Sequence, residues 1–291
     1  MGRTARRSCI SSSPIALLGT AIAASSLWAS AARAGDPFEI QVYDGTSNAP
    51  LVPGIELHLN DWATGNHEAT PPEAPLHGQF HATLEPSLGL TPFWELGAYL
   101  EGAARTDAGV VEWGGMKLRS KFVTPPSWDP HWRLGVNLEV GYLPATYDHD
   151  QWGSEVRPIV AWHSDAWLFA LNPILDQPLR GADASQGPSF QPALKVARTV
   201  GPVALGFEYY ATLGPLSGFA PWKEQQQQIF EVLDLLAIAH FELNAGVGEG
   251  LTASSEGLVF KMILGYEFDT SEPAPATTKM ARAASNLLRK P

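Results

Sequence analysis

The chain has 291 residues with one cysteine, and its 19 basic and 30 acidic residues give a net charge of −11. Charged residues make up 17% of the chain, below the roughly 25% of average globular domains, and hydrophobic residues make up 45%. A single cysteine excludes a disulfide framework and a multi-cysteine metal site, and the acidic balance argues against a nucleic-acid partner. These totals fit a soluble acidic enzyme and a membrane β-barrel equally well.

Residues 1–34 have the three parts of a secretory signal peptide. Three arginines lie within the first seven residues, an apolar stretch covers 15–24, and a small–x–small pattern ends at Ala34. We therefore predict export and cleavage after Ala34. The removed segment contains the only cysteine and four arginines, so the mature chain is free of cysteine and strongly acidic.

Beyond residue 34 the dominant pattern is alternation of apolar and polar residues, which is typical of β-strands. From Trp132 to Tyr142, every second residue is apolar and the residues between are polar or small. Twelve such strands are predicted, most of them as long as the ~9–11 residues of a tilted membrane strand, whereas strands in soluble sheets average about five or six. Their ranges are 54–62, 78–86, 93–103, 110–123, 132–143, 153–163, 166–175, 189–199, 202–213, 227–236, 240–250 and 257–268.

Two segments are ambiguous. The apolar residues of 227–236 also fit helical spacing. We assign a strand because both termini of the chain lie on the same side of the membrane only if the number of strands is even. Residues Phe38 to Asp44 alternate as well and are predicted to form a short extra pairing segment.

The connections between the predicted strands alternate between short and long. This alternation is expected of an outer-membrane barrel with short periplasmic turns and longer outer loops. Tryptophans gather beside the short turns, as in the aromatic girdle at a membrane interface. They are Trp94, Trp128, Trp132, Trp162 and Trp167.

The predicted last strand has apolar residues on one parity and ends in the aromatic residue Phe268. This pattern resembles the terminal signal by which the barrel-assembly machinery recognises its substrates. Residues 269–291 follow it and are predicted to form a periplasmic tail. The predicted organisation is therefore a signal peptide (1–34), an all-β, transmembrane, antiparallel up-and-down barrel of about 12 strands (35–268) and this tail.

The chain resembles a poorly characterised class of bacterial outer-membrane β-barrels, whose members are labelled as transporters or likened to the MetA protein of phenol-degradation pathways. The resemblance rests on Gly89-Leu90-Thr91-Pro92 leading into Trp94-Glu95-Leu96-Gly97, on Glu208-Tyr209-Tyr210, and on the closing strand. It implies passage of a small solute, hydrophobic or aromatic in kind, and it implies no catalytic residues.

Charged residues of the polar parity are expected to face the barrel interior, because Arg or Lys on the lipid face costs about 2–4 kcal/mol at mid-depth. Two interpretations stay open: a pore lining that selects solutes by sign, or a salt-bridged interior that only neutralises buried charge. The candidate pore-lining residues are Lys117, Arg119, Lys121, Arg133, Arg157, Glu95, Glu101 and Glu139.

Enzyme and cofactor motifs are absent from the sequence, so no catalytic, cofactor or metal residues are predicted. His163-Ser164-Asp165 has the residue types of a hydrolase, but neighbouring residues in one turn cannot form a triad. Asp148-His149-Asp150, in an expected outer loop, could contact a divalent cation or could be an ordinary solvated acidic loop.

The sequence thus predicts an outer-membrane channel or transporter for a small, unidentified solute, with membrane lipids and the assembly machinery as partners. A lipid-modifying barrel hydrolase and a closed structural or adhesion barrel are the alternatives.

Overall fold

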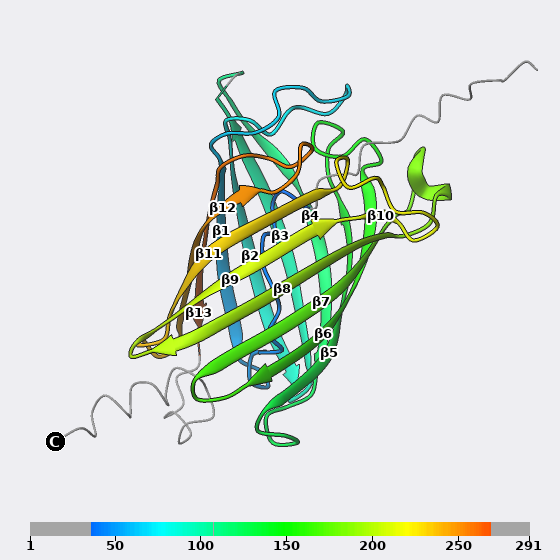
Figure 1. The fold of residues 1–291 in the computed structure, drawn as a ribbon. Coiled ribbons are helices and arrows are strands. Elements are labelled where there is room, and N and C mark those ends of the chain that lie inside the picture. Colours follow the sequence, from blue (N-terminus) through cyan, green and yellow to red (C-terminus); the bar gives the residue numbers. More distant parts are fainter. Residues whose placement is uncertain (1–35, 107, 269–291) are drawn as a thin grey trace, which may run out of the picture.

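The computed structural model describes residues 36–106 and 108–268, and these form a closed antiparallel β-barrel (Figure 1). The predicted signal peptide and tail lie outside the described residues. Each long strand pairs with its neighbours along the chain, and β1 pairs with β13 to close the barrel. The twelve long strands confirm the predicted up-and-down fold, including the ambiguous segment, which forms β11.

The strands are close to their predicted ranges, and several extend beyond them. They are β1 (Pro53–Trp62), β2 (Gln79–Thr91), β3 (Trp94–Arg105), β4 (Val110–Val123), β5 (Trp132–Tyr142), β6 (Trp152–His163), β7 (Trp167–Pro178), β8 (Ser189–Val200), β9 (Val203–Thr212), β11 (Gln226–Leu235), β12 (Phe241–Gly250) and β13 (Val259–Glu267). A two-residue strand, β10 (Gly214–Pro215), pairs with β8, and a single 3₁₀ turn, η1 (Asp183–Ser185), lies between β7 and β8.

The connections at one end of the barrel are mostly longer than those at the other, as predicted from the sequence (Figure 1). The long-loop end has five extended loops, 63–78, 143–151, 179–188, 213–225 and 251–258, and the connection from β3 to β4. The opposite, short-turn end has the connections 92–93, 124–131, 164–166, 201–202 and 236–240. The predicted girdle tryptophans all lie at the short-turn end.

The apolar and polar residues that alternate along each strand face opposite sides of the barrel wall. In β5, Leu134 and Leu138 are exposed, whereas Arg133, Asn137 and Glu139 are buried. The barrel is therefore inverted relative to a soluble protein, with its apolar residues outside and its charged residues inside. Such an outer surface is suited to lipid. Among the described residues no helix has both the length and the apolar character needed to cross a membrane.

This outer surface allows a test by substitution at two depths. Leu138 lies at the middle of β5, and Leu134 lies near its short-turn end. If lipid surrounds the barrel, Leu138→Arg should lower the free energy of unfolding in lipid vesicles by about 2–4 kcal/mol, and Leu134→Arg by about 0–1 kcal/mol. Denaturant titration of both variants measures the difference. Equal costs at the two depths would contradict a lipid-facing surface.

Candidate functional site

The N-terminal residues 36–50, which we call the luminal segment, run through the inside of the barrel. In Figure 1 this segment is the dark blue trace enclosed by the strands. Phe38 is fully buried and Tyr43 is 7% exposed, although neither belongs to a strand. The prediction that Phe38 to Asp44 form an extra pairing segment is wrong. Its apolar side chains pack in hydrophobic clusters of the inner wall, Glu39 pairs with Arg157, and the segment does not join the sheet.

Side chains of the wall satisfy the backbone of the luminal segment. Asn60 Nδ2 donates to the carbonyl oxygens of Pro37 (3.2 Å) and Phe38 (3.1 Å). Further along, Asn172 bonds both the amide (2.7 Å) and the carbonyl (3.0 Å) of Tyr43. Lys261 Nζ donates to the carbonyl of Ile40 (3.0 Å). Buried backbone groups need partners, and here wall side chains provide those that a neighbouring strand would otherwise provide.

Small residues of the wall leave room for the segment. The ring of Phe38 stacks on His81 with centroids 4.3 Å apart and packs edge-on against Tyr147. A Cβ on Gly114 would lie 2.4 Å from that ring, and one on Gly89 would lie 2.3 Å from the carbonyl oxygen of Ala49. The inner surface is therefore complementary in shape to the luminal segment near both of its ends.

Charge pairing also fixes the segment in the lumen. Arg157 donates to Glu39 of the segment (2.9 Å) and to Glu155 of its own strand (2.6 Å). The same guanidinium lies over the ring of Tyr43, 4.5 Å from its centroid. A buried charge is tolerated only when it is paired and hydrogen-bonded, so Glu39 and Arg157 each depend on the other.

All eight candidate pore-lining residues are buried in the barrel interior, and most of them are ion-paired. Arg119 contacts Glu85 and lies 2.7 Å from Glu95, which also pairs with Lys121 at 2.9 Å. Lys117 contacts Asp36, and its Nζ lies 3.8–3.9 Å from the carboxylates of Glu39, Glu101 and Glu139. Arg133 differs, because its guanidinium donates to the backbone carbonyls of Asp129 and Trp132.

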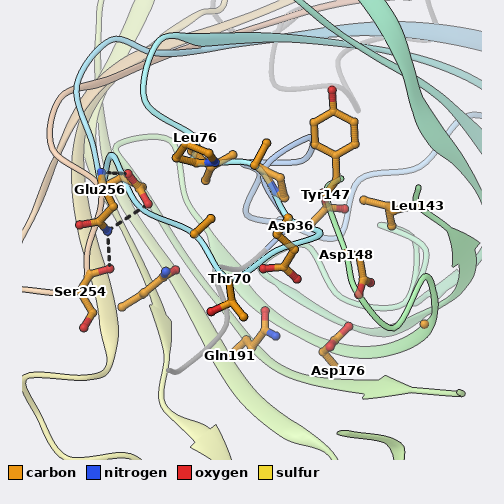
Figure 2. A pocket seen from close by; sticks show the side chains of 18 of the residues that line it. Asp36, Thr70, Leu76, Leu143, Tyr147, Asp148, Asp176, Gln191, Ser254 and Glu256 are labelled. Carbon is orange, nitrogen blue, oxygen red and sulfur yellow. Dashed lines mark hydrogen bonds between the residues drawn. The ribbon is translucent and has the colours of Figure 1, made fainter. Parts of the chain in front are cut away.

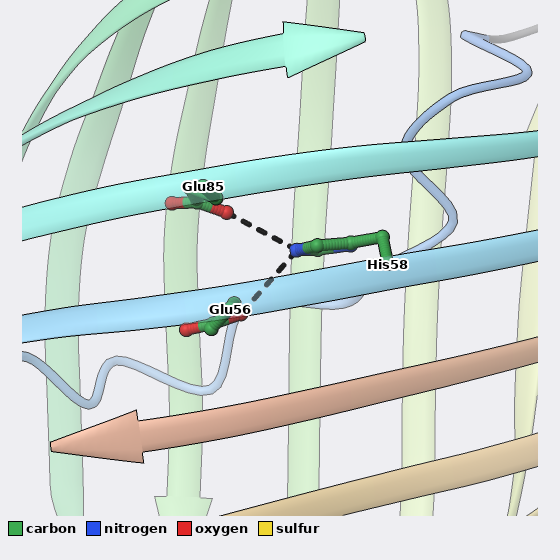
Figure 3. Close-up of side chains that lie close together, drawn as sticks. All are labelled: Glu56, His58 and Glu85. Atoms are coloured by element: carbon green, nitrogen blue, oxygen red, sulfur yellow. Dashed lines mark hydrogen bonds and ion pairs between the residues drawn. The ribbon is translucent and has the colours of Figure 1, made fainter. Parts of the chain in front are cut away.

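Other interior charges also form compact clusters. His58 Nε2 lies 3.4 Å from Glu56 and 3.2 Å from Glu85 (Figure 3). In a second cluster, Glu208 of β9 contacts Lys195 of β8 and Lys261 of β13. The interior is therefore a network of paired charges. Asp36 and Glu39 complete this network and were missed by the sequence analysis, which considered only strand residues.

A cavity of about 500 Å³ lies at the long-loop end, and we call it the loop-end cavity (Figure 2). It reaches from the loops down to Lys117, the only basic residue among the described residues that line it. Apolar side chains, among them Leu76, Leu143 and Tyr147, form part of its wall. Eight carboxylates line it: Asp36, Glu68, Glu73, Glu139, Asp148, Glu155, Asp176 and Glu256.

Hydrogen bonds between two loops build one side of this cavity (Figure 2). The backbone amide of Asn66 donates to Glu256 Oε2 (2.7 Å), and its side-chain amide donates to Glu256 Oε1 and to the carbonyl of Ser254 (both 3.2 Å). Burial raises the pKa of the Glu256 carboxyl above its usual range, while the bonds from Asn66 act in the opposite direction. The 63–78 and 251–258 loops are thus held together beside the cavity.

His163, Ser164 and Asp165 are not arranged as a catalytic triad. Ser164 Oγ bonds the backbone of Trp167, and His163 Nε2 lies 2.8 Å from the carbonyl of Asp44 in the luminal segment. These hydrogen bonds give both residues structural contacts at the short-turn end.

The chain matches solved structures, but it matches no family model and no curated sequence. An outer-membrane channel from Pseudomonas putida F1 has a TM-score of 0.53 at 12% identity, with 79% of this chain and 100% of that chain covered. That likeness supports the barrel fold.

Two other solved barrels match less well. The KdgM porin, in complex with oligogalacturonate, has a TM-score of 0.46 at 10% identity, covering 74% of this chain and 99% of its own. An active-site mutant of outer membrane phospholipase A from Escherichia coli has a TM-score of 0.40 at 12% identity, covering 82% of this chain and 95% of its own.

The fit between Gly114 and Phe38 can be tested with a matched pair of glycine variants. Gly114→Ala should lower the free energy of unfolding by about 1–3 kcal/mol, because the new methyl group overlaps a ring that is already packed on two sides. Gly153→Ala is the control, since nothing lies within 4 Å of a Cβ there. Adding Phe38→Leu to Gly114→Ala should recover part of the loss. Denaturant unfolding measures all three variants, and no recovery would mean that Phe38 is not seated against Gly114.

Proposed function

We propose that this protein is an outer-membrane channel that admits small solutes from the long-loop end. The predicted signal peptide supports export, and the apolar outer surface with a charged interior supports insertion in a lipid bilayer. The exposed aromatic residues Phe260 and Tyr266 of β13, with Phe268 directly after it, support recognition by the barrel-assembly machinery.

The loop-end cavity is the observation that carries this proposal. Its volume of about 500 Å³ is within the range of small-molecule sites, and it is open to the loops. Among the described residues of its lining, carboxylates outnumber basic residues eight to one; Lys117 is already paired with Asp36, and Glu155 with Arg157, so acidic charge remains in excess. Such a lining attracts cations and repels anions. We therefore propose small cationic solutes, whose apolar parts would contact Leu76, Leu143 and Tyr147.

In this proposal the described conformation is the closed state. The luminal segment fills the space below the loop-end cavity, with Phe38, Ile40 and Val42 buried among wall residues. Passage of a solute then requires movement of the luminal segment. A permanently closed structural barrel is the second candidate, and the tight fit of the same segment favours it.

Conductance across a planar bilayer separates the two candidates. The wild-type protein should show small or rare currents, and a variant lacking residues 37–46 should show currents several-fold larger, because its lumen is no longer filled. Slower gel migration after boiling would verify that each variant is folded. A wild-type protein that carries no current at any voltage would refute the channel and leave the permanently closed barrel, since deletion of the segment would open either one.

Ion selectivity tests the role of the acidic lining. Asp176→Asn, which removes one carboxylate from the loop-end cavity, should lower the ratio of cation to anion permeability obtained from the reversal potential. Asp165→Asn makes the same chemical change in a turn at the opposite end and is the control. An equal effect of both variants would show that the cavity does not determine selectivity.

A further inference from the structure

Three loops of the long-loop end bring one histidine and several carboxylates together. His149 lies in the β5–β6 loop, Glu73 in the β1–β2 loop, and Asp183 in the 3₁₀ turn η1 of the β7–β8 loop. Asp150 follows His149 directly and is buried. From this arrangement we propose that His149, Asp150 and Asp183 bind a divalent transition-metal ion such as Zn²⁺, with Glu73 orienting the histidine.

The two ring nitrogens of His149 have different surroundings. Nδ1 lies 2.7 Å from Glu73 Oε1, which is the distance of a strong charge-assisted hydrogen bond. Nε2 lies 3.3 Å from Asp183 Oδ2 and 3.5 Å from Asp150 Oδ1, which is too long for such a bond. Nδ1 therefore serves as the donor to a carboxylate, and Nε2 faces two further carboxylates.

The longer distances match those between ligands of one metal ion. Zinc binds histidine nitrogen and carboxylate oxygen at about 2.0–2.2 Å, so two such ligands at a tetrahedral angle lie about 3.4 Å apart. The ligand atoms of His149, Asp150 and Asp183 all lie within 4.8 Å of one another. A histidine that binds a metal commonly donates its second ring nitrogen to a carboxylate, which is the place that Glu73 occupies.

The buried carboxylate of Asp150 is a second observation that supports a bound cation. Its side chain is 1% exposed, and within the described part of the chain its Oδ2 atom has no hydrogen-bond partner. Its other oxygen, Oδ1, accepts from the backbone amide of Ala182 (2.9 Å), which fixes the carboxylate beside η1. A buried carboxylate oxygen without a donor is costly unless a cation neutralises it. A metal ion between Asp150, Asp183 and His149 would do so.

The ligand set favours a transition metal over calcium. Imidazole nitrogen suits Zn²⁺ and its neighbours, whereas Ca²⁺ takes six to eight oxygen ligands. His149 is partly exposed, so water can occupy the remaining coordination position. Bound metal would join the β5–β6 and β7–β8 loops directly and the β1–β2 loop through Glu73, beside the loop-end cavity.

Zinc binding to the detergent-solubilised protein, prepared without an affinity tag, tests this proposal. Metal analysis after dialysis against Zn²⁺ should give one zinc per chain, and competition with a chromophoric chelator gives the dissociation constant. Asp183→Asn and His149→Ala should abolish retention of zinc, and Glu73→Gln should weaken binding by about 10–100-fold, as loss of an orienting carboxylate does. Calcium at the same concentration should not displace the zinc.

The control is His67→Ala, which removes a histidine from the same end of the barrel without touching the proposed ligands. Heat-modified gel migration verifies that every variant retains the folded barrel. Absence of zinc in the wild-type protein would overturn the proposal. Equal binding by the His149→Ala and His67→Ala variants would also overturn it, by placing the zinc elsewhere.

Discussion

The pairing of buried charges is the constraint on which the rest of this structure depends. A closed barrel with an apolar outer surface must place its charged strand residues inside, where an unpaired charge is costly. Partners on the strands provide only part of this pairing. Lys117, Arg157 and Lys261 each complete their contacts with the luminal segment, through Asp36, Glu39 and the carbonyl of Ile40. The segment is therefore part of the electrostatic balance of the barrel.

The luminal segment in turn depends on the wall. It has no neighbouring strand, so its backbone groups are satisfied one at a time by side chains such as Asn60 and Asn172. Gly114 and Gly89 leave the space that Phe38 and Ala49 fill. Movement of the segment during transport would break these bonds and leave charges such as Arg157 with fewer partners, so water or solute would have to replace them.

The strands could be predicted from the sequence because their alternation is local, and Trp132 to Tyr142 is the plainest example. The luminal segment could not, since Phe38 to Asp44 alternates in the same way and its partners are distant in the chain. Tyr43 and Asn172 bond across 129 residues. The proposed metal site was partly visible in the sequence as Asp148-His149-Asp150, but Glu73 and Asp183 come from other loops, which the closed barrel brings together.

The pairing inside the barrel also changes where ion selectivity would arise. Lys117, Arg119 and Lys121 form a basic row in the sequence, which suggests a positive pore lining. In the structure carboxylates surround this row, and Glu95 alone contacts both Arg119 and Lys121. The row therefore presents little net positive charge to a passing ion. An excess of acidic charge lies nearer the loops, in the loop-end cavity, where carboxylates outnumber the one lysine of the described lining even after the pairing of Glu155 with Arg157. In the proposed channel a solute from the long-loop end meets this cavity first, so the acidic lining would select solutes by charge before they reach the luminal segment.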